Sequence, residues 1–329
     1  MDTAERYELF AEFEVRGHSP SSAAWSRGIA SDPAILALID QLPAGKRRPN
    51  HVLAAARFLG AEPGPYPRFR DWLLAHWDRV AEVALARFTQ TNEPGRTATL
   101  LPLLARLPGP LALIEVGASA GLCLYPDRYS YRYDDTVTLD PAAGASPVLL
   151  PCATTGNPPL PAELPIVVSR TGIDVNPLDV AAPDDMAWLE ALVWPEQRHR
   201  LRRLRAAAEI VRADPPAMIT GDLLDTVAAA VAAAPAEATV VVFGSAVLTY
   251  LDPASRRAFE TLVHALPCRW IANEGAGVLD SVAARLPYPP HTTRDRFVLS
   301  LDGRPVAYAG PHGQSLDWLA DTAVVREDH

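Results

Sequence analysis

Apolar side chains recur at helical spacing through the first third of the chain. The stretches AERYELFAEFEVRG and YPRFRDWLLAHWDRVAEVALARF place them three and four residues apart. Other stretches begin with Asp, Asn or Pro and stop near a glycine, as helices do at their ends. No strand pattern interrupts them. Residues 1–107 are therefore predicted to form an all-helical domain, a lid or substrate domain over a pocket.

From residue 108 onward, short apolar runs alternate with helical stretches. The apolar runs lie at 111–116, 165–175, 217–220, 239–247 and 268–275. The helical patterns lie at 184–212, 222–234 and 253–266. This alternation predicts a Rossmann-like α/β domain over 108–329 with a mostly parallel sheet. Asp302-Gly303 between alternating segments predicts a closing antiparallel hairpin. Alternating tyrosines in YPDRYSYRYDDTVTLD predict an inserted β-hairpin, within an insertion at about 125–163.

Composition narrows the classes of partner. The formal net charge of −9 argues against nucleic acid, because binding to a duplex depends on neutralising phosphates. Three widely spaced cysteines match neither a disulfide framework nor a zinc motif, which favours a cytoplasmic location and no metal. No apolar run approaches the ~20 residues of a membrane span. A small-molecule substrate is the remaining expectation.

One motif, LALIEVGASAGLCL at 111–124, has two interpretations. Gly117 to Gly121 fit G-x-S-x-G, the turn that presents the nucleophile Ser119 in serine hydrolases. Alternatively, a first strand runs into a Gly-containing loop that holds a nucleotide cofactor at the start of the next helix. Only helical patterns precede this strand, and no HGGG-like oxyanion segment is present. Glu115 suits an ammonium group, so the cofactor interpretation is favoured.

These residues resemble the first motif of class I S-adenosylmethionine-dependent methyltransferases, acid-x-Gly-x-Gly-x-Gly, with Ser119 at the central glycine. GIDVNP, ITGDLLD and VVVFGSAVLTYL follow in the order of that family's later motifs, so the resemblance covers about 111–310. It implies a class I methyltransferase fold that binds S-adenosyl-L-methionine. The cofactor-binding residues that it implies are Glu115, Gly117, Ala118, Ser119, Gly121, Asp174, Asp222, Leu223 and Ser245.

The acid that holds the ribose is ambiguous. Asp174 lies 53 residues after Gly121, whereas the usual spacing is ~20 residues. Asp140 lies 19 residues after Gly121 and competes for the role. Asp174 is favoured because it follows a better buried strand.

Other polar residues are candidates for substrate binding or proton transfer. Asn50, Asn92 and Arg96 are candidate substrate contacts, although helix capping and surface ion pairing also explain them. His312, Tyr131 and Glu274 are candidate bases for an acceptor that must lose a proton. Tyr131 also has a purely structural interpretation, in which it packs against the neighbouring strand on one face of the hairpin.

The whole chain also resembles an uncharacterised bacterial family, domain of unknown function 2332, through segments such as TQTNEPGR, DRYSYRY and PHGQSLDWL. That resemblance implies no substrate. The sequence therefore predicts a methyltransferase that acts on a small molecule. Two alternatives remain: a non-catalytic module that binds an S-adenosyl ligand on the same fold, and a serine hydrolase using Ser119.

Overall fold

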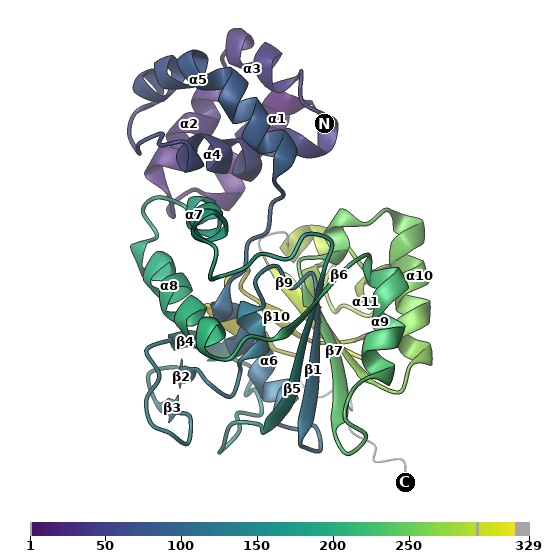
Figure 1. The fold of residues 1–329 in the computed structure, drawn as a ribbon. Coiled ribbons are helices and arrows are strands. Elements are labelled where there is room, and N and C mark those ends of the chain that lie inside the picture. The colour runs from purple at the N-terminus through teal and green to yellow at the C-terminus, as the bar shows by residue number, and fades with distance from the viewer. Residues whose placement is uncertain (1, 294–295, 320–329) are drawn as a thin grey trace. The chain divides into compact units, whose positions relative to one another are not determined.

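The computed structural model describes residues 2–293 and 296–319, which form two compact units (Figure 1). The helical unit comprises Met1–Thr91 and Leu178–Leu204, and the sheet unit comprises Asn92–Pro177 and Arg205–His329. This division differs from a single boundary at residue 107. The fully buried helix at 97–104 belongs to the sheet unit, and a later segment returns to the helical unit.

The helical unit is built from α-helices that mostly begin at or next to a proline. Proline occupies the first or second position of α2 to α5, where the missing N–H costs no helical hydrogen bond. Its elements before residue 92 are α1 (Thr3–Leu9), η1 (Phe10–Glu14), α2 (Pro20–Ala30), α3 (Pro33–Ile39), η2 (Ala44–Lys46), α4 (Pro49–Phe58) and α5 (Tyr66–Ala86). Helix α7 (Pro183–Leu192) packs against α4 and completes the unit. The helical pattern at 184–212 is broken after α7, at Pro195, and resumes as α8 (Arg198–Ala213).

The sheet unit contains an eleven-stranded sheet in the order β3-β2-β4-β11-β10-β9-β8-β7-β1-β5-β6. Its strands are β1 (Leu111–Val116), β2 (Ser130–Tyr133), β3 (Val137–Leu139), β4 (Leu149–Thr155), β5 (Val167–Asp174), β6 (Ala217–Thr220), β7 (Thr239–Ser245), β8 (Arg269–Gly275), β9 (Phe297–Leu301), β10 (Arg304–Ala309) and β11 (Ser315–Trp318). Its helical elements are η3 (Pro94–Arg96), α6 (Thr97–Leu104), η4 (Leu122–Leu124), α9 (Leu223–Ala232), η5 (Leu248–Tyr250), α10 (Pro253–Ala265), α11 (Asp280–Ala283) and η6 (Pro290–Thr293). This mixed, mostly parallel open sheet with helices is consistent with the predicted Rossmann-like α/β fold.

Both predicted hairpins are present. Strands β9 and β10 pair antiparallel around Asp302 (φ 49°) and Gly303 (φ 73°), as an Asp-Gly turn requires. Strands β2 and β3 pair antiparallel around Asp134 (φ 50°) and Asp135 (φ 55°). The insertion goes further than a hairpin, because β4 pairs parallel with both β2 and β11 and so joins the insertion to the main sheet.

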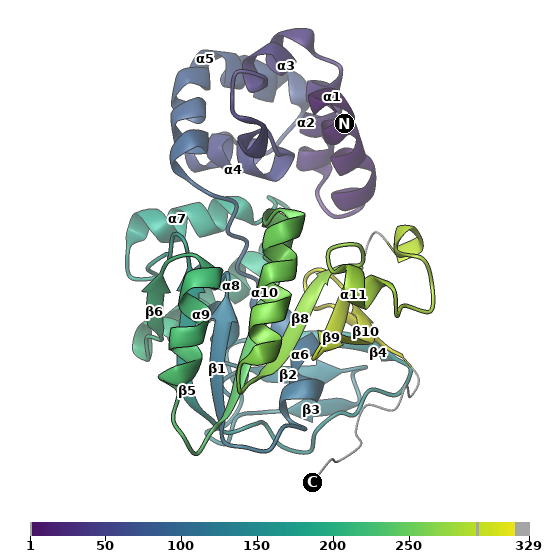
Figure 2. The same ribbon diagram turned by 90° about the vertical axis from the view of Figure 1, so that its right-hand side faces the viewer.

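The two faces of the central strands bury different residues. Alternate residues of β1, β5, β7 and β8 pack with α9 and α10 in one apolar cluster that includes Ile114, Val116, Val227, Val242, Phe259 and Trp270. Figure 2 shows α9 and α10 side by side in front of these strands. Because successive side chains of a strand point to opposite faces, Glu115 lies on the other face. Among the described residues, no helix has the length and apolar character needed to cross a membrane.

One sequence expectation for the first strand is wrong. The loop after β1 leads into a single 3-10 turn, η4, and not into the long helix of a dinucleotide-binding unit. Pro126 follows closely, and the tyrosines beyond it favour strand, so a helix has no room to extend. The loop at 117–121 therefore does not lie at the N-terminus of a helix, and the polar side chains around it come from other elements.

Candidate functional site

The strand order identifies one place where an open α/β sheet binds ligands. Strand β1 pairs parallel with β5 on one side and with β7 on the other. The order in which the strands follow one another along the chain therefore reverses at β1, which makes it the switch point of the sheet. In doubly wound sheets, the crevice outside the carboxyl ends of such strands is the usual ligand site. The loop at 117–121 leaves β1 at this point.

This loop takes a left-handed backbone at every second residue. Gly117, Ser119 and Gly121 have φ values of 70°, 53° and 73°. Ser119, which stands where the methyltransferase motif has glycine, therefore adopts a conformation that glycine favours. The loop is fixed to the end of β5, because Ile173 O accepts from Gly117 N (2.8 Å) and Ala118 N (3.1 Å).

Asp174 holds the same loop through its carboxylate. Its Oδ2 accepts from Ser119 N at 2.8 Å, and its Oδ1 accepts from Asn176 N at 2.9 Å. The side chain is buried. Asp174 is therefore a loop-positioning residue as well as the candidate ribose contact.

Gly117 is required by a close neighbour. A Cβ added at Gly117 would lie 2.4 Å from Cγ2 of Val247, in the turn after β7. That turn is held by Glu274, whose Oε1 accepts from Val247 N (2.9 Å) and Leu248 N (3.0 Å). The glycine thus lets the loops after β1 and β7 approach each other.

Four polar residues share the face of the sheet that carries Glu115. The register pairs Glu115 with Gly172 and Phe243, and Ser245 with Asn273. By alternation, Asp174, Ser245 and Asn273 lie on the same face as Glu115. Asn273 Nδ2 donates to Ser245 Oγ at 2.9 Å. Two fully buried acceptor atoms on this face, Glu115 Oε2 and Asn273 Oδ1, have no hydrogen-bond partner.

Arg96 lies against the end of β7. Its Nη1 donates to Ser245 O at 3.0 Å and its Nε donates to Pro311 O at 2.9 Å. The second bond brings in the loop that carries His312. This loop approaches so closely that a Cβ on Gly313 would lie 1.8 Å from Gly95 O. The structure thus brings Arg96 and the loop of His312 to the end of β7.

The turn at 92–96 is also tied to the cofactor-type loop. Asn92 Oδ1 accepts from Leu122 N at 2.8 Å, just after Gly121. Glu93 Oε1 accepts from Gly95 N at 3.0 Å, and the thiol of Cys123 donates to Glu93 O at 3.4 Å. Asn92 therefore binds the backbone just after the loop at 117–121. This differs from the helix capping that its sequence context also allowed.

Burial raises the pKa of two carboxyl groups near the ends of the central strands. The pKa of Glu115 is raised well above its usual value by burial, against a smaller lowering by the charge of Arg96, while Asp174 raises it further. Burial raises the pKa of Glu274 to about 7, although the N–H groups of Leu248 and Val247 and the charge of Arg96 lower it. Both carboxyl groups therefore bind a proton more tightly than an exposed glutamate does.

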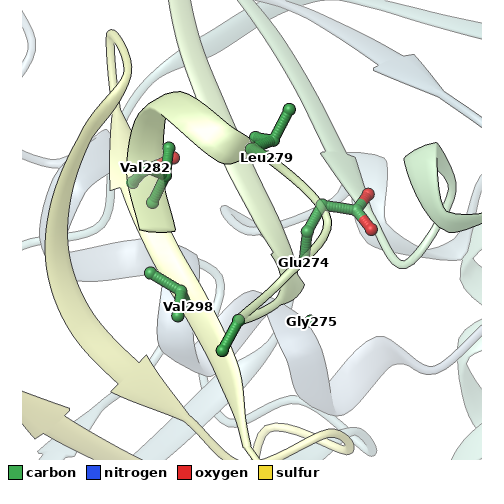
Figure 3. A pocket seen from close by; sticks show the side chains of 7 residues that line it. Glu274, Gly275, Leu279, Val282 and Val298 are labelled. Carbon is green, nitrogen blue, oxygen red and sulfur yellow. The ribbon is translucent and has the colours of Figure 1, made fainter. Parts of the chain in front are cut away.

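Glu274 also borders a small cavity on the opposite face. The cavity has room for roughly one water molecule, since its volume is about 10 Å³. Its lining residues are Glu274, Gly275, Ala276, Leu279, Val282, Val298 and Ser300. Figure 3 shows the carboxyl group turned away from Val282 and Val298. Its unpartnered Oε2 is fully buried. The cavity is too small for a substrate.

Several predicted residues lie away from the loop after β1, or have other structural roles. Tyr131 is fully buried and donates its hydroxyl to Pro126 O at 2.6 Å, so it has no access to a substrate. Burial raises its pKa further, which disfavours a phenolate base. Tyr131 is better explained by core packing, including a stacked contact with Tyr133 at 6.4 Å between ring centroids.

Asp222, Leu223 and Asn50 also have local structural roles. Asp222 is the exposed N-cap of α9 beyond the end of β6, and its Oδ1 accepts from Leu224 N at 2.8 Å. Leu223 is buried in the apolar cluster. Asn50 belongs to the helical unit, inside a helix that begins at Pro49, and its Oδ1 accepts from Trp194 Nε1 at 2.8 Å. It is therefore not the N-cap of its helix.

Sequence reasoning missed Asn273 and Val247. Asn273 is 0% exposed, and its signal was the polar pair in WIANEG at the end of an apolar strand. Val247 gave no signal, since only packing against Gly117 reveals it. Within the described ranges, no group of three or more His, Cys, Asp and Glu side chains is placed to hold a metal ion.

Comparisons with known proteins give one match. No curated protein and no solved structure matches the chain. A family model described as "Uncharacterized protein conserved in bacteria (DUF2332)" matches residues 4–318, almost the whole chain. The chain therefore belongs to this family of bacterial proteins.

Proposed function

We propose that this protein binds S-adenosyl-L-methionine at the carboxyl ends of the central strands, beside the loop after β1, and transfers its methyl group to a small molecule. One observation carries the proposal. At the switch point of the sheet, a loop with alternating left-handed residues lies beside Glu115, whose Oε2 is buried and unpartnered. An unpartnered buried oxygen is costly unless a ligand satisfies it. The family resemblance of the motif names the ligand class.

The residues present suit such a ligand. Glu115 offers an acceptor for an ammonium group, and Asp174 places a carboxylate beside the loop, where the hydroxyl groups of a ribose would bind. The bound cofactor supplies an activated methyl group on its sulfonium. The protein's part is to align donor and acceptor and to exclude water. Burial of Glu115, Asn273 and Arg96 provides a site with little water.

Two of the candidate bases remain in this proposal. Glu274 has a pKa of about 7, suited to proton transfer near neutral pH, but its Oε1 is engaged by the turn after β7. His312 lies on the loop that Arg96 binds through Pro311 O. We assign His312 as the first residue to test, because its loop borders the face that carries Glu115.

The central experiment is a calorimetric titration with S-adenosylhomocysteine. We expect binding to the full chain, and we expect Asp174→Ala to weaken it by about 1–3 kcal/mol, the range for hydrogen bonds to a charged group. Asp140→Ala is the matched control. Asp140 follows β3 at the far edge of the sheet and accepts from Ser130 Oγ at 2.5 Å, so its loss should leave affinity unchanged. No heat at millimolar ligand would refute the proposal, and the reverse ranking would move the ribose site to the insertion.

Ser119→Gly separates the proposal from a serine hydrolase. Because Ser119 has φ 53°, glycine should be tolerated and should shift the unfolding free energy by no more than about 1 kcal/mol. Affinity for S-adenosylhomocysteine should stay within about fivefold, as for one neutral hydrogen bond. Urea unfolding and titration check both.

The hydrolase alternative predicts a different result for the same variant. An elbow serine lies between a strand and a helix, whereas η4 after Ser119 is a single turn. Esterase activity that is present in the wild type and lost in both Ser119→Gly and Ser119→Ala would establish the hydrolase. Binding without turnover of any acceptor would instead favour a non-catalytic module.

A further inference from the structure

The first helix of the helical unit has an acidic outer face. Along α1 and η1, Glu5, Glu8 and Glu12 follow one another at intervals of three and four residues, which places them on one side of the helix. Glu5 and Glu8 are exposed, and Glu12 pairs with Arg16. Among the described residues, no cation forms an ion pair with Glu5 or Glu8. This acidic stripe, Glu5, Glu8 and Glu12, therefore faces solvent.

Two exposed apolar side chains accompany the acidic stripe. Leu9 is 40% exposed, and Phe13, four residues later, is 72% exposed. Side chains four residues apart are neighbours on a helix, so the two form one apolar spot beside the stripe. Exposed apolar groups rimmed by charged residues are typical of protein–protein contact sites. The surface is therefore suited to a partner that is basic.

The helical unit also carries an exposed basic face, on the first turns of α8. Arg198 and Arg202 lie four residues apart, so they share one side of the helix, and both belong to the helical unit. Both are exposed, and so is His199 beside them. Neither guanidinium has an ion-pair partner in the part of the chain that the structure describes. The chain as a whole has a formal net charge of −9, so this face is attracted to other copies of the chain.

The acidic stripe and the basic face match in spacing. Glu8 and Glu12 lie four residues apart, as Arg198 and Arg202 do, which corresponds to about 6 Å along a helix axis. If the two helices lie antiparallel, Arg202 faces Glu8 and Arg198 faces Glu12. Each guanidinium then meets a carboxylate, and no like charges are brought together.

The start of α8 is fixed beside η1 in the same unit. Trp194 makes an edge-on contact with Phe10 at 6.1 Å between ring centroids. Glu196 accepts from Ser19 Oγ at 2.5 Å and from Ser21 N at 3.1 Å. One copy therefore presents both faces on one unit. In a two-fold dimer, each copy would offer its acidic stripe to the basic face of the other, so the match would occur twice.

We infer that the helical unit carries a dimerisation surface, on which the acidic stripe and Phe13 of one copy bind Arg198 and Arg202 of a second copy. Opposite charges give the contact its orientation and specificity, and the apolar spot adds buried area. Because the paired charges lie at the surface, the dimer is weak and is weakened further by salt. The inference does not depend on the proposed function.

The test is analytical ultracentrifugation of the full chain at low and high salt. We expect a monomer–dimer equilibrium whose dissociation constant rises about tenfold between about 0.05 M and about 0.5 M salt. Phe13→Ala leaves the charges intact and should weaken the dimer by about fivefold.

Two charge reversals test the pairing itself. Arg202→Glu and Glu8→Arg each change an exposed helical position, and each alone should weaken the dimer at least about tenfold, because the change acts twice in a two-fold dimer. An equal mixture of the two variants should dimerise about as well as the wild type. In the mixed dimer, the new carboxylate at position 202 faces the new guanidinium at position 8, and the other pair is wild type.

Arg79→Glu is the control, since it makes the same charge change at an exposed position of α5 and should leave the equilibrium unchanged. Circular dichroism checks that each variant is folded. A wild type that stays monomeric at low salt would overturn the inference, and so would a dimer that neither reversal weakens. Loss of the dimer in both single variants without recovery on mixing would also overturn it. Recovery on mixing supports it.

Discussion

Gly117→Val is expected to destabilise the protein by roughly 2–5 kcal/mol. A left-handed backbone costs a non-glycine residue about 1–2 kcal/mol, and overpacking a core costs about 1–3 kcal/mol. Both apply here, because Gly117 has φ 70° and an added Cβ would meet Val247 at 2.4 Å. The clash is with the turn after β7, so the substitution tests the packing of the two loops. Urea unfolding measures the loss.

Two further variants isolate the cause. Val247→Ala in the Gly117→Val background should recover part of the loss, because it removes the methyl groups that clash. Gly277→Ala is the control, since Gly277 is exposed and has nothing within 4 Å of an added Cβ. A Gly117→Val protein as stable as the wild type, or no recovery in the double variant, would contradict the loop contact.

Glu274→Gln is expected to stabilise the protein at alkaline pH and to leave it nearly unchanged at pH 4. Burial raises the pKa of Glu274 to about 7 from an ordinary value near 4.5. Below the ordinary value, both folded and unfolded states are protonated and ionisation costs nothing. As pH rises from about 4.5 to 7, the unfolded state releases its proton while the folded state holds it, and above about 7 the folded state must hold a buried carboxylate, so stability falls by about 3 kcal/mol over this range.

Glutamine removes this loss and keeps an oxygen for the N–H groups of Val247 and Leu248. Urea unfolding at pH 4 and pH 8.5 gives the difference between variant and wild type at each pH. Glu115 makes the stability of both proteins pH-dependent in the same direction, so only their difference is diagnostic. Glu237→Gln, at an exposed position, should show no such difference. A stability difference that is equal at both pH values would contradict the buried carboxylate.

Local patterns predicted the elements of the sheet well. The runs at 111–116 and 217–220 match β1 and β6, and the Asp302-Gly303 signal gave its hairpin. These succeed because a strand's apolar run and a turn's left-handed residues are local properties. The position of Glu115 and its loop followed from the same strand and glycine pattern.

Such local patterns could not predict which strands pair when they are far apart in the sequence. Strand β11 lies between β10 and β4, and nothing in its four residues specifies either neighbour. The sequence could not exclude Tyr131 and Asn50 as site residues. Their hydrogen-bond partners, Pro126 O and Trp194 Nε1, are known only from the folded structure. The sequence made Arg96 a candidate substrate contact, but its two carbonyl partners lie 149 and 215 positions away along the chain.

The helical unit is completed only after a large part of the sheet unit has been synthesised. Its first five α-helices end at Ala86, but α7 begins only at Pro183, after β1 to β5. Trp188 of α7 makes edge-on contacts with His51 and Phe58, both at 5.9 Å between ring centroids, and donates to Phe88 O at 3.0 Å. Since domains fold as they emerge from the ribosome at about 5–20 residues per second, these five helices wait several seconds with an apolar face uncovered. A nascent chain that stops at Pro177 would present that face to chaperones, and a fragment of residues 1–91 would carry the same exposed surface permanently.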